Sequence, residues 1–221
     1  MDNTKTINSG VGDDLYYQTH YLSRVWNDYL WIVDKAKQLS VKGKVVDLGC
    51  GVGYLVEAFH NSGYECVGIE GAEAGVKIAQ SRNSELKIFH QMLSEKLPFE
   101  DNSVQIVILN QVIEHLESSV QQNCISEAYR ILAKGGLILV YSPSKYNLDE
   151  QKADATHINL LSPTELSVLL RSNGFHSLIV LSKELIYLWD GGKIIKKITN
   201  KLYRIIKPER LMAHASFAAY K

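Results

Sequence analysis

Alternate glycines follow an apolar stretch early in the chain and indicate a ligand-binding turn. Residues 45–55 read VVDLGCGVGYL, so that three alternate glycines begin two residues after an aspartate. Glycine lets a backbone approach a ligand closely, and open α/β sheets bind ligands at the carboxyl ends of their strands. The spacing excludes a dinucleotide turn, which would need its third glycine where Tyr54 stands, and a P-loop, which would need Gly-Lys-Ser/Thr.

One carboxylate and two histidines are the other side chains with suitable chemistry. Glu70 ends the apolar run at 67–70, about 20 residues after the glycine turn, where a carboxylate can accept hydrogen bonds from ribose hydroxyls. His115 closely follows another apolar run, and His157 lies in the sequence THIN after a later one. Either imidazole could act as a base if an acceptor must lose a proton. His115 could equally brace its loop through hydrogen bonds.

These features resemble the class I S-adenosylmethionine-dependent methyltransferases, and most closely the broad group called methyltransferase type 11. The motifs follow in the family's order: an acidic strand end with G-x-G-x-G, an acidic end to the next strand, LPFEDNS at 97–103, a fourth strand exit at 110–116 and RILAKGG at 130–136. The resemblance covers roughly residues 43–175. It implies that the chain binds S-adenosylmethionine and releases S-adenosylhomocysteine.

The resemblance also implies which residues bind the cofactor. Many relatives place an aspartate against the adenine amino group, but this chain has Leu93 there. Adenine would then rest on the side chains of Met92 and Leu93 and on the backbone of Ser94, because pocket walls and backbone groups can orient a ligand. The full set is Asp47, Gly49, Cys50, Gly51, Glu70, Gly71, Met92, Leu93, Ser94 and Asn110.

A metal site is an alternative that one residue argues against. Some relatives bind a divalent metal through E-x-x-E-H and a later histidine, which would fall on Gln111, Glu114, His115 and His157. Gln111 replaces the first carboxylate, and the loss of an anionic oxygen ligand weakens a site for a hard cation. We therefore expect no metal, and we assign His115 and His157 as the candidate catalytic residues.

Strands and helices that alternate along the chain must position these residues. β-branched runs separated by helical patterns predict a parallel sheet with crossover helices. The runs lie at 44–48, 65–70, 87–91, 104–109 and 137–141, and two further β-like stretches lie at 175–183 and 213–220. With the strand order supplied by the resemblance, we expect a doubly wound, Rossmann-like α/β fold whose seven-stranded sheet has five parallel strands and an antiparallel C-terminal pair.

Helix signals add detail to this fold. Helical spacing predicts a helix over 21–39. Capping boxes are predicted where Ser118 precedes Gln121 and where Ser162 and Pro163 precede Glu165. We divide the chain into an N-terminal segment and helix, 1–42, and a methyltransferase domain, 43–221, with a basic amphipathic insert at 190–210.

Two segments outside the motifs leave alternatives open. Tyr16, Tyr17 and His20 could cover the cofactor as a lid, or could simply be a packed or disordered N-terminus. Residues 193–207 read KIIKKITNKLYRIIK, which projects as a helix with one apolar and one basic face. We favour packing of the apolar face on the domain, and keep peripheral contact with an anionic membrane as the alternative.

Composition limits the class of protein. The 221 residues are 46% hydrophobic, which suits one compact domain. Lys plus Arg and Asp plus Glu both number 24, so no net field attracts nucleic acid. Cys50, Cys66 and Cys124 lack metal-ligand spacing and suit reduced thiols in the cytosol. A polar N-terminus and the lack of a long apolar run favour a cytoplasmic protein.

The function expected is methyl transfer to oxygen or nitrogen of a small metabolite, a glycan-related molecule or a lipid-linked acceptor. A non-catalytic module that binds S-adenosylmethionine without turnover is one alternative. An RNA methyltransferase is another, and the neutral charge disfavours it because an RNA track needs a broad basic face. The sequence does not assign an oligomeric state.

Overall fold

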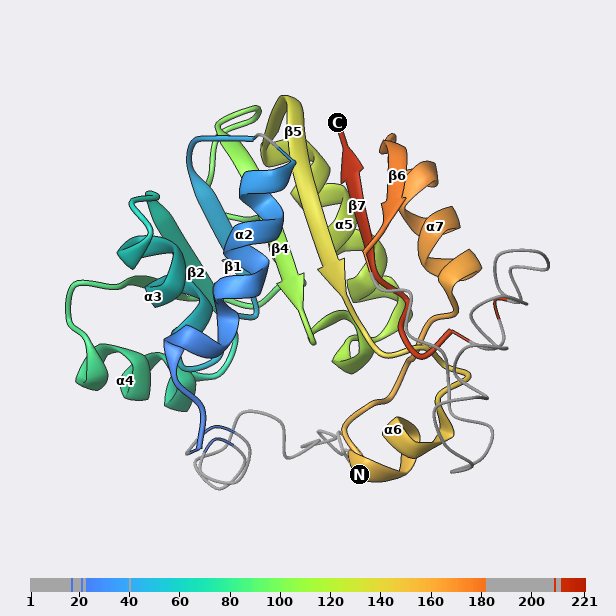
Figure 1. Ribbon diagram of the computed structural model, residues 1–221, viewed down its shortest axis with the longest axis horizontal. Coiled ribbons are helices and arrows are strands. Elements are labelled where there is room, and N and C mark those ends of the chain that lie inside the picture. The colour runs from blue at the N-terminus through green and yellow to red at the C-terminus, as the bar shows by residue number, and fades with distance from the viewer. Residues whose placement is uncertain (1–16, 18–20, 22, 40, 182–208, 210–211) are drawn as a thin grey trace, which may run out of the picture.

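The computed structural model describes residues 17, 21, 23–39, 41–181, 209 and 212–221. In these ranges seven strands form one sheet with the order β3-β2-β1-β4-β5-β7-β6 (Figure 1). The strands are β1 (Val45–Leu48), β2 (Cys66–Glu70), β3 (Lys87–His90), β4 (Val104–Asn110), β5 (Leu132–Tyr141), β6 (His176–Val180) and β7 (Phe217–Tyr220). Strands β1 to β5 pair in parallel, whereas β7 pairs antiparallel with both β5 and β6. The expected doubly wound fold is confirmed.

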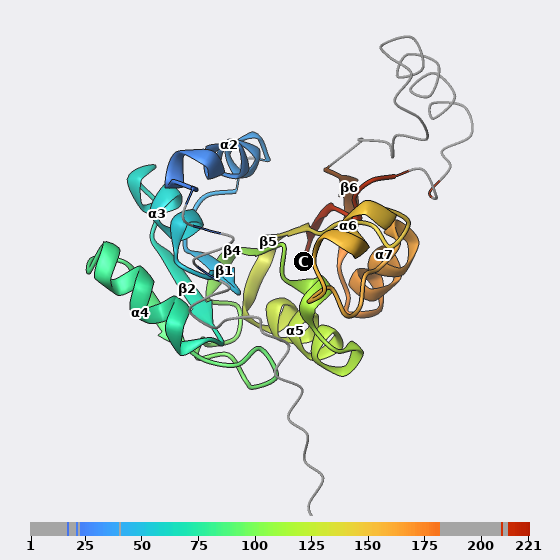
Figure 2. The same cartoon turned by 90° about the horizontal axis from the view of Figure 1, so that it is seen from below.

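Helices cover both faces of this sheet (Figure 2). One face carries the 3-10 helix η1 (Trp26–Tyr29), α2 (Leu30–Gln38), α3 (Tyr54–Asn61) and α4 (Glu73–Arg82). The other face carries α5 (Ser118–Ile131) and α7 (Pro163–Ser172). The short helices η2 (Ile113–His115) and α6 (Leu148–Ala153) follow β4 and β5 in the chain, at the end of the sheet where the parallel strands finish.

The core lies on both faces of the sheet because successive strand side chains point to opposite sides. In β4, Val107 and Leu109 belong to the cluster under α5 and α7, while Ile106 and Ile108 belong to the cluster under α2 and α3. All four are fully buried. Strands buried on both faces read as continuous apolar runs, which is why these segments were recognisable in the sequence.

Two helix predictions need correction. The helix expected over 21–39 is interrupted: Tyr21 is helical, residues 23–25 are not, and η1 and α2 follow. The capping box expected at Ser118 is also wrong, because Glu117 is the N-cap residue of α5 and its side chain makes no capping hydrogen bond. The Ser118 hydroxyl instead accepts a hydrogen bond from the side-chain amide of Asn159, at 3.0 Å. The box at Ser162 is confirmed, with Pro163 in the first turn of α7.

Some expectations concern residues that the structure does not describe. Tyr16, His20 and the basic segment 193–207 lie outside the described residues. None of the helices in the described ranges has both the length and the apolar character needed to cross a membrane. Cys50, Cys66 and Cys124 are buried free thiols, as expected.

Candidate active site

The glycine turn follows β1 and is tied to the neighbouring strand through its backbone. The N–H groups of Gly49 and Cys50 both donate to the carbonyl of Ile69 in β2, at 2.8 and 3.0 Å. Gly49 has a φ of +74°, and a Cβ placed on it would lie 2.6 Å from a methyl of Val112. A side chain at this position would therefore be strained by the backbone and would collide with the segment after β4.

Glu70 completes this turn. The buried carboxylate ends β2 and accepts the backbone N–H of Gly51 at 2.7 Å and that of Ala72 at 2.8 Å. The Tyr17 hydroxyl also donates to it. A carboxylate offers about four lone-pair positions, so a ribose hydroxyl can still be accepted or can replace Tyr17. Two of the predicted cofactor residues, Gly51 and Glu70, are thus in direct contact.

Asp47 lies under the same turn, in β1, and is almost fully buried. Burial raises the pKa of its carboxyl to about 8, and the nearby negative charge of Glu70 adds to the rise. At neutral pH the carboxyl is therefore mostly protonated in the ligand-free protein. A cationic group of a ligand placed here would favour the ionised form.

The loop after β3 brings the predicted adenine residues beside β2. A Cβ on Gly71 would lie 3.1 Å from the sulfur of Met92, so the loops after β2 and β3 touch there. Met92 is half exposed, Ser94 is exposed, and Leu93 is buried in the core below α5. On this loop Met92 is therefore the apolar side chain open to a ligand. We call the glycine turn 49–53, Glu70 and the loop 91–94 the cofactor half of the site.

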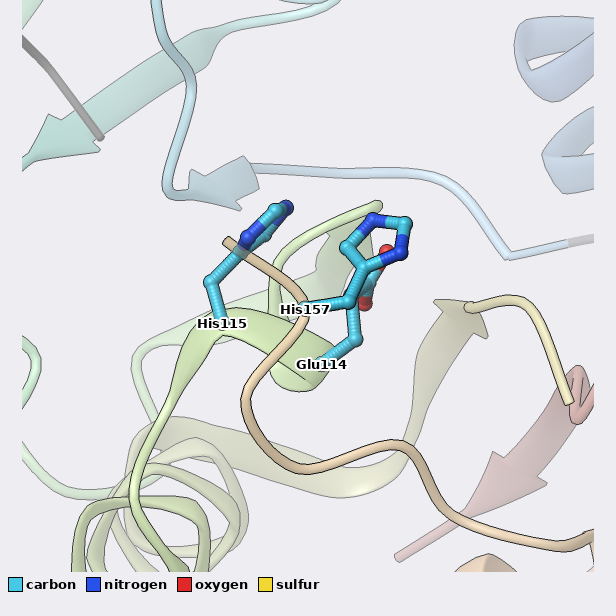
Figure 3. A group of neighbouring side chains, drawn as sticks. All are labelled: Glu114, His115 and His157. Carbon is cyan, nitrogen blue, oxygen red and sulfur yellow. The ribbon is translucent and has the colours of Figure 1, made fainter. Parts of the chain in front are cut away.

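The predicted histidines come from two segments that are distant in sequence. His115 ends η2, just after Gln111, which has a φ of +58°. His157 lies in the loop after α6, and the two rings are 4.9 Å apart between centroids. Their side chains and that of Glu114 extend toward one another in Figure 3. We call η2 and the loop 154–159 the acceptor half of the site.

Each histidine is held through its Nδ1 atom. Nδ1 of His115 lies 3.0 Å from both the carbonyl and the hydroxyl oxygen of Thr156. Nδ1 of His157 lies 3.1 Å from the carbonyl oxygen of Glu150. The structure thus brings together the two histidines that the sequence singled out, and it orients both.

Glu114 is the unusual group of the acceptor half. It is fully buried, and neither carboxylate oxygen has a hydrogen-bond partner among the described residues. Burial raises the pKa of Glu114 to about 8. Its own backbone and the Ser142 hydroxyl lie near enough to oppose this rise in pKa, but neither has the geometry of a hydrogen bond to the carboxyl group. One of its oxygens and one ring nitrogen each of His115 and His157 lie within 4.8 Å of one another, a spacing that could hold a metal ion.

Comparisons with known proteins indicate the family of the domain that carries this site. The family described as "Methyltransferase domain" matches residues 46–140. A probable S-adenosylmethionine-dependent methyltransferase of Mycolicibacterium smegmatis is 34% identical over 134 residues, which cover 59% of this chain and 51% of that protein. A class I S-adenosylmethionine-dependent methyltransferase domain is present in this chain. S-adenosylmethionine is the cofactor of that family.

Further relatives of the methyltransferase domain are more distant. The mitochondrial ubiquinone biosynthesis O-methyltransferase of Rattus norvegicus is 28% identical over 162 residues, which cover 64% of this chain and 46% of that protein. The crystal structure of a SAM-dependent methyltransferase from Archaeoglobus fulgidus has a TM-score of 0.72 at 18% identity, covering 95% of this chain and all of that one. The chain spans about half the length of the first curated relatives it matches.

The methyltransferase domain also uses residues that the sequence analysis did not select. Gln121 of α5 is buried and donates its amide to the carbonyls of Ile113 and Asn159, at 2.7 and 2.9 Å. The backbone N–H of Asn159 donates to the carbonyl of Glu114 at 3.0 Å. These contacts join η2 to the loop after α6. A glutamine three residues after Ser118 was visible in the sequence, but its position suggested a helix cap.

Asp154 and Tyr141 were missed as well. Asp154 accepts both the backbone N–H and the hydroxyl of Thr156. Burial alone would raise the pKa of Asp154, but the hydrogen bonds from Thr156 outweigh it and lower the pKa. The Tyr141 hydroxyl, at the end of β5, is buried without a hydrogen-bond partner among the described residues. A single aspartate in a loop or a single tyrosine at the end of a strand gives no sequence signal of this kind.

Proposed function

We propose that the chain transfers a methyl group from S-adenosylmethionine to an oxygen or nitrogen atom of a small-molecule acceptor. One observation carries the proposal: the turn that Glu70 holds and the His115–His157 pair follow strands of the same sheet, whose carboxyl ends lie on the same side. Val112 connects them, because it packs against Gly49 and directly precedes η2. A cofactor on the first half would place its methyl group toward the second.

The chain's own residues supply binding, alignment and a base. S-adenosylmethionine, when bound, provides a methyl group on a positively charged sulfur, ready for in-line displacement. The backbone of Gly49 to Gly51 and the Glu70 carboxylate would hold its amino acid and ribose parts. Alignment of acceptor, methyl and sulfur supplies a large share of the rate enhancement. His115 or His157 would take a proton where the acceptor carries one.

One distant relative is compatible with oxygen as the acceptor atom and does not identify the acceptor. The Rattus norvegicus relative is an O-methyltransferase of ubiquinone biosynthesis. A glycan-related or lipid-linked acceptor is included in the proposal. Membrane contact through residues 193–207 stays the alternative to packing on the domain, because that segment lies outside the described residues. Flotation with anionic liposomes, compared between the wild type and a variant in which Lys196, Lys197 and Lys201 are glutamate, tests that contact.

Two experiments test the proposal in turn. Calorimetry with S-adenosylhomocysteine measures binding, and labelled S-adenosylmethionine added to fractionated metabolite extracts measures methyl transfer. Binding followed by label in a small-molecule fraction supports it. Binding without transfer to any fraction would favour the alternative, a non-catalytic module. Label in the RNA fraction alone would favour an RNA methyltransferase. Lack of binding to either form of the cofactor would overturn the proposal.

A further inference from the structure

The hydrogen bonds around Thr156 determine which nitrogen of His115 carries its proton. Asp154 accepts the backbone N–H of Thr156 at 2.8 Å and also its hydroxyl. The hydroxyl hydrogen is therefore directed to Asp154, and the lone pairs of that oxygen face other groups. The carbonyl of Thr156 can only accept. Both oxygens lie 3.0 Å from Nδ1 of His115, so Nδ1 must be the donor.

The second histidine has the same arrangement. Nδ1 of His157 faces the carbonyl of Glu150 at 3.1 Å, and a carbonyl only accepts, so this Nδ1 also carries a hydrogen. In the neutral form of each ring the lone pair is then on Nε2. His157 Nε2 lies 3.8 Å from an oxygen of Asp154, which is too long for a hydrogen bond.

In both histidines of the acceptor half, the lone pair of the neutral ring is therefore on Nε2. One nitrogen of each ring lies within 4.8 Å of a buried carboxyl group that has no hydrogen-bond partner among the described residues (Figure 3). A lone pair on Nε2 of an oriented imidazole suits an acceptor that must lose a proton. A carboxylate acceptor has no proton to lose, so it would make no use of such a base.

We propose that Asp154, acting through Thr156, is a positioning residue that holds His115 with its proton on Nδ1, and that the methyl acceptor is consequently a hydroxyl, phenol or amine rather than a carboxylate. This inference rests on the proposed function. In the step it describes, the carbon–sulfur bond breaks as a carbon–oxygen or carbon–nitrogen bond forms. The proton of the acceptor moves to Nε2 of His115, and the imidazolium later loses a proton to water.

Replacement of Asp154 changes the tautomer through a specific route. In Asp154→Asn the side-chain amide can donate to the Thr156 oxygen, and the hydroxyl hydrogen is then able to turn toward Nδ1 of His115. The Thr156 carbonyl still accepts from Nδ1, so the ring divides between the wild-type form and a form with its proton on Nε2, which cannot accept a proton from a substrate. Thr156→Ser keeps the hydroxyl and should keep the wild-type tautomer. Asp149→Asn is the matched control, because Asp149 is exposed on α6.

Nitrogen-15 NMR of the histidine rings tests the positioning role without any acceptor. The wild type, Thr156→Ser and Asp149→Asn should show a protonated Nδ1 and an unprotonated Nε2 for His115, and Asp154→Asn should show a mixed pattern with the His157 signals in place. A wild-type ring protonated on Nε2, or an Asp154→Asn spectrum identical to the wild type, would overturn the proposal. These spectra stand even if the proposed methyl transfer fails.

The labelled products test the acceptor class. Methyl label transferred to a metabolite fraction should stay bound in mild alkali, as ethers and methylamines do. Release of the label as methanol would identify methyl esters and refute the inference while leaving methyl transfer intact. With the acceptor known, Asp154→Asn should lower kcat by about 10-fold or more with a smaller change in KM, since a positioned base typically contributes 10²-fold or more. Equal kcat in Asp154→Asn and Asp149→Asn would contradict the positioning role.

Discussion

The cofactor half and the acceptor half of the site are built by different means. In the cofactor half, backbone N–H groups of the glycine turn and of Ala72 donate to Ile69 and Glu70, so these contacts join the ends of the neighbouring strands β1 and β2. In the acceptor half, side chains join η2 to a loop about 40 residues later, and Glu114 stays without a hydrogen-bond partner among the described residues. The Glu70 carboxylate of the cofactor half is thus hydrogen-bonded before a ligand binds, whereas the Glu114 carboxyl group of the acceptor half is not.

The difference explains why the cofactor is easier to identify than the acceptor. A backbone turn between two adjacent strands depends on a few residue types at fixed spacing, so it leaves a local motif. Contacts between side chains from distant segments leave no such pattern. Four predictions test whether the two halves behave as differently as their construction indicates.

Gly49→Ala should have the largest effect on stability and on cofactor binding, because it changes the backbone of the cofactor half. The left-handed φ and the 2.6 Å approach to Val112 should together cost about 2 to 5 kcal/mol of unfolding free energy. Binding of S-adenosylhomocysteine should become undetectable by calorimetry. Gly63→Ala is the control, since Gly63 also has a positive φ but no atom within 4 Å of the place that a Cβ would take. Equal destabilisation by both variants would show that the close approach to Val112 adds nothing to the cost of the positive φ.

The buried carboxyl groups give each half its own dependence on pH. Folded pKa values of about 8 for Asp47 and Glu114 lie above the ordinary values of 3.8 and 4.5. The stability that their protonated forms contribute is complete below about pH 4 and is lost as the pH rises toward 8. Asp47→Asn and Glu114→Gln should each stabilise the ligand-free protein by roughly 2 to 4 kcal/mol at pH 8 and hardly at pH 4.5.

Denaturant unfolding between pH 4.5 and 8 measures this dependence. Glu95→Gln, at an exposed position, serves as the control and should leave the pH profile unchanged. Cofactor binding should make the two variants differ. It should reduce the stability gained by Asp47→Asn at pH 8 more than that gained by Glu114→Gln, because Asp47 lies beneath the turn. Flat profiles for both variants would show that burial does not raise the pKa values of Asp47 and Glu114.

Glu70→Ala should weaken binding of S-adenosylmethionine by roughly 1 to 3 kcal/mol, through the loss of charge-assisted hydrogen bonds. The change also leaves the N–H groups of Gly51 and Ala72 without their acceptor. Glu73→Ala, which removes an exposed carboxylate paired with Lys77, should have no measurable effect on binding. Calorimetry with both variants makes the comparison. Unchanged affinity in Glu70→Ala would remove Glu70 from the binding site.

Metal removal should have the smallest effect, because we propose that transfer needs no metal. Gln111 stands where a carboxylate ligand would be expected, and burial favours the protonated form of Glu114. A chelator should leave turnover and melting temperature unchanged. Turnover that disappears with the chelator and returns with magnesium would show that Glu114, His115 and His157 hold a cation after all.

Ser118 and Gln121 show where sequence reasoning reaches its limit. Their spacing is that of a capping box, and a rule based on local spacing assigns them to the start of α5. In the structure Ser118 accepts from Asn159, and Gln121 donates to Ile113 and Asn159. A polar side chain has several competing partners of similar energy, and only the arrangement of the whole chain decides among them.

The sequence by itself determined the fold class and the cofactor half. Apolar runs of strand length, the alternate glycines and Glu70 are local signals, since strand burial and turn geometry depend on residues close in sequence. Only the tertiary structure decided the acceptor half. It placed Thr156 and Asp154 against His115, left Glu114 buried without a hydrogen-bond partner among the described residues, and set both histidine tautomers. Those features depend on contacts between segments far apart in the chain, for which spacing along the sequence carries no information.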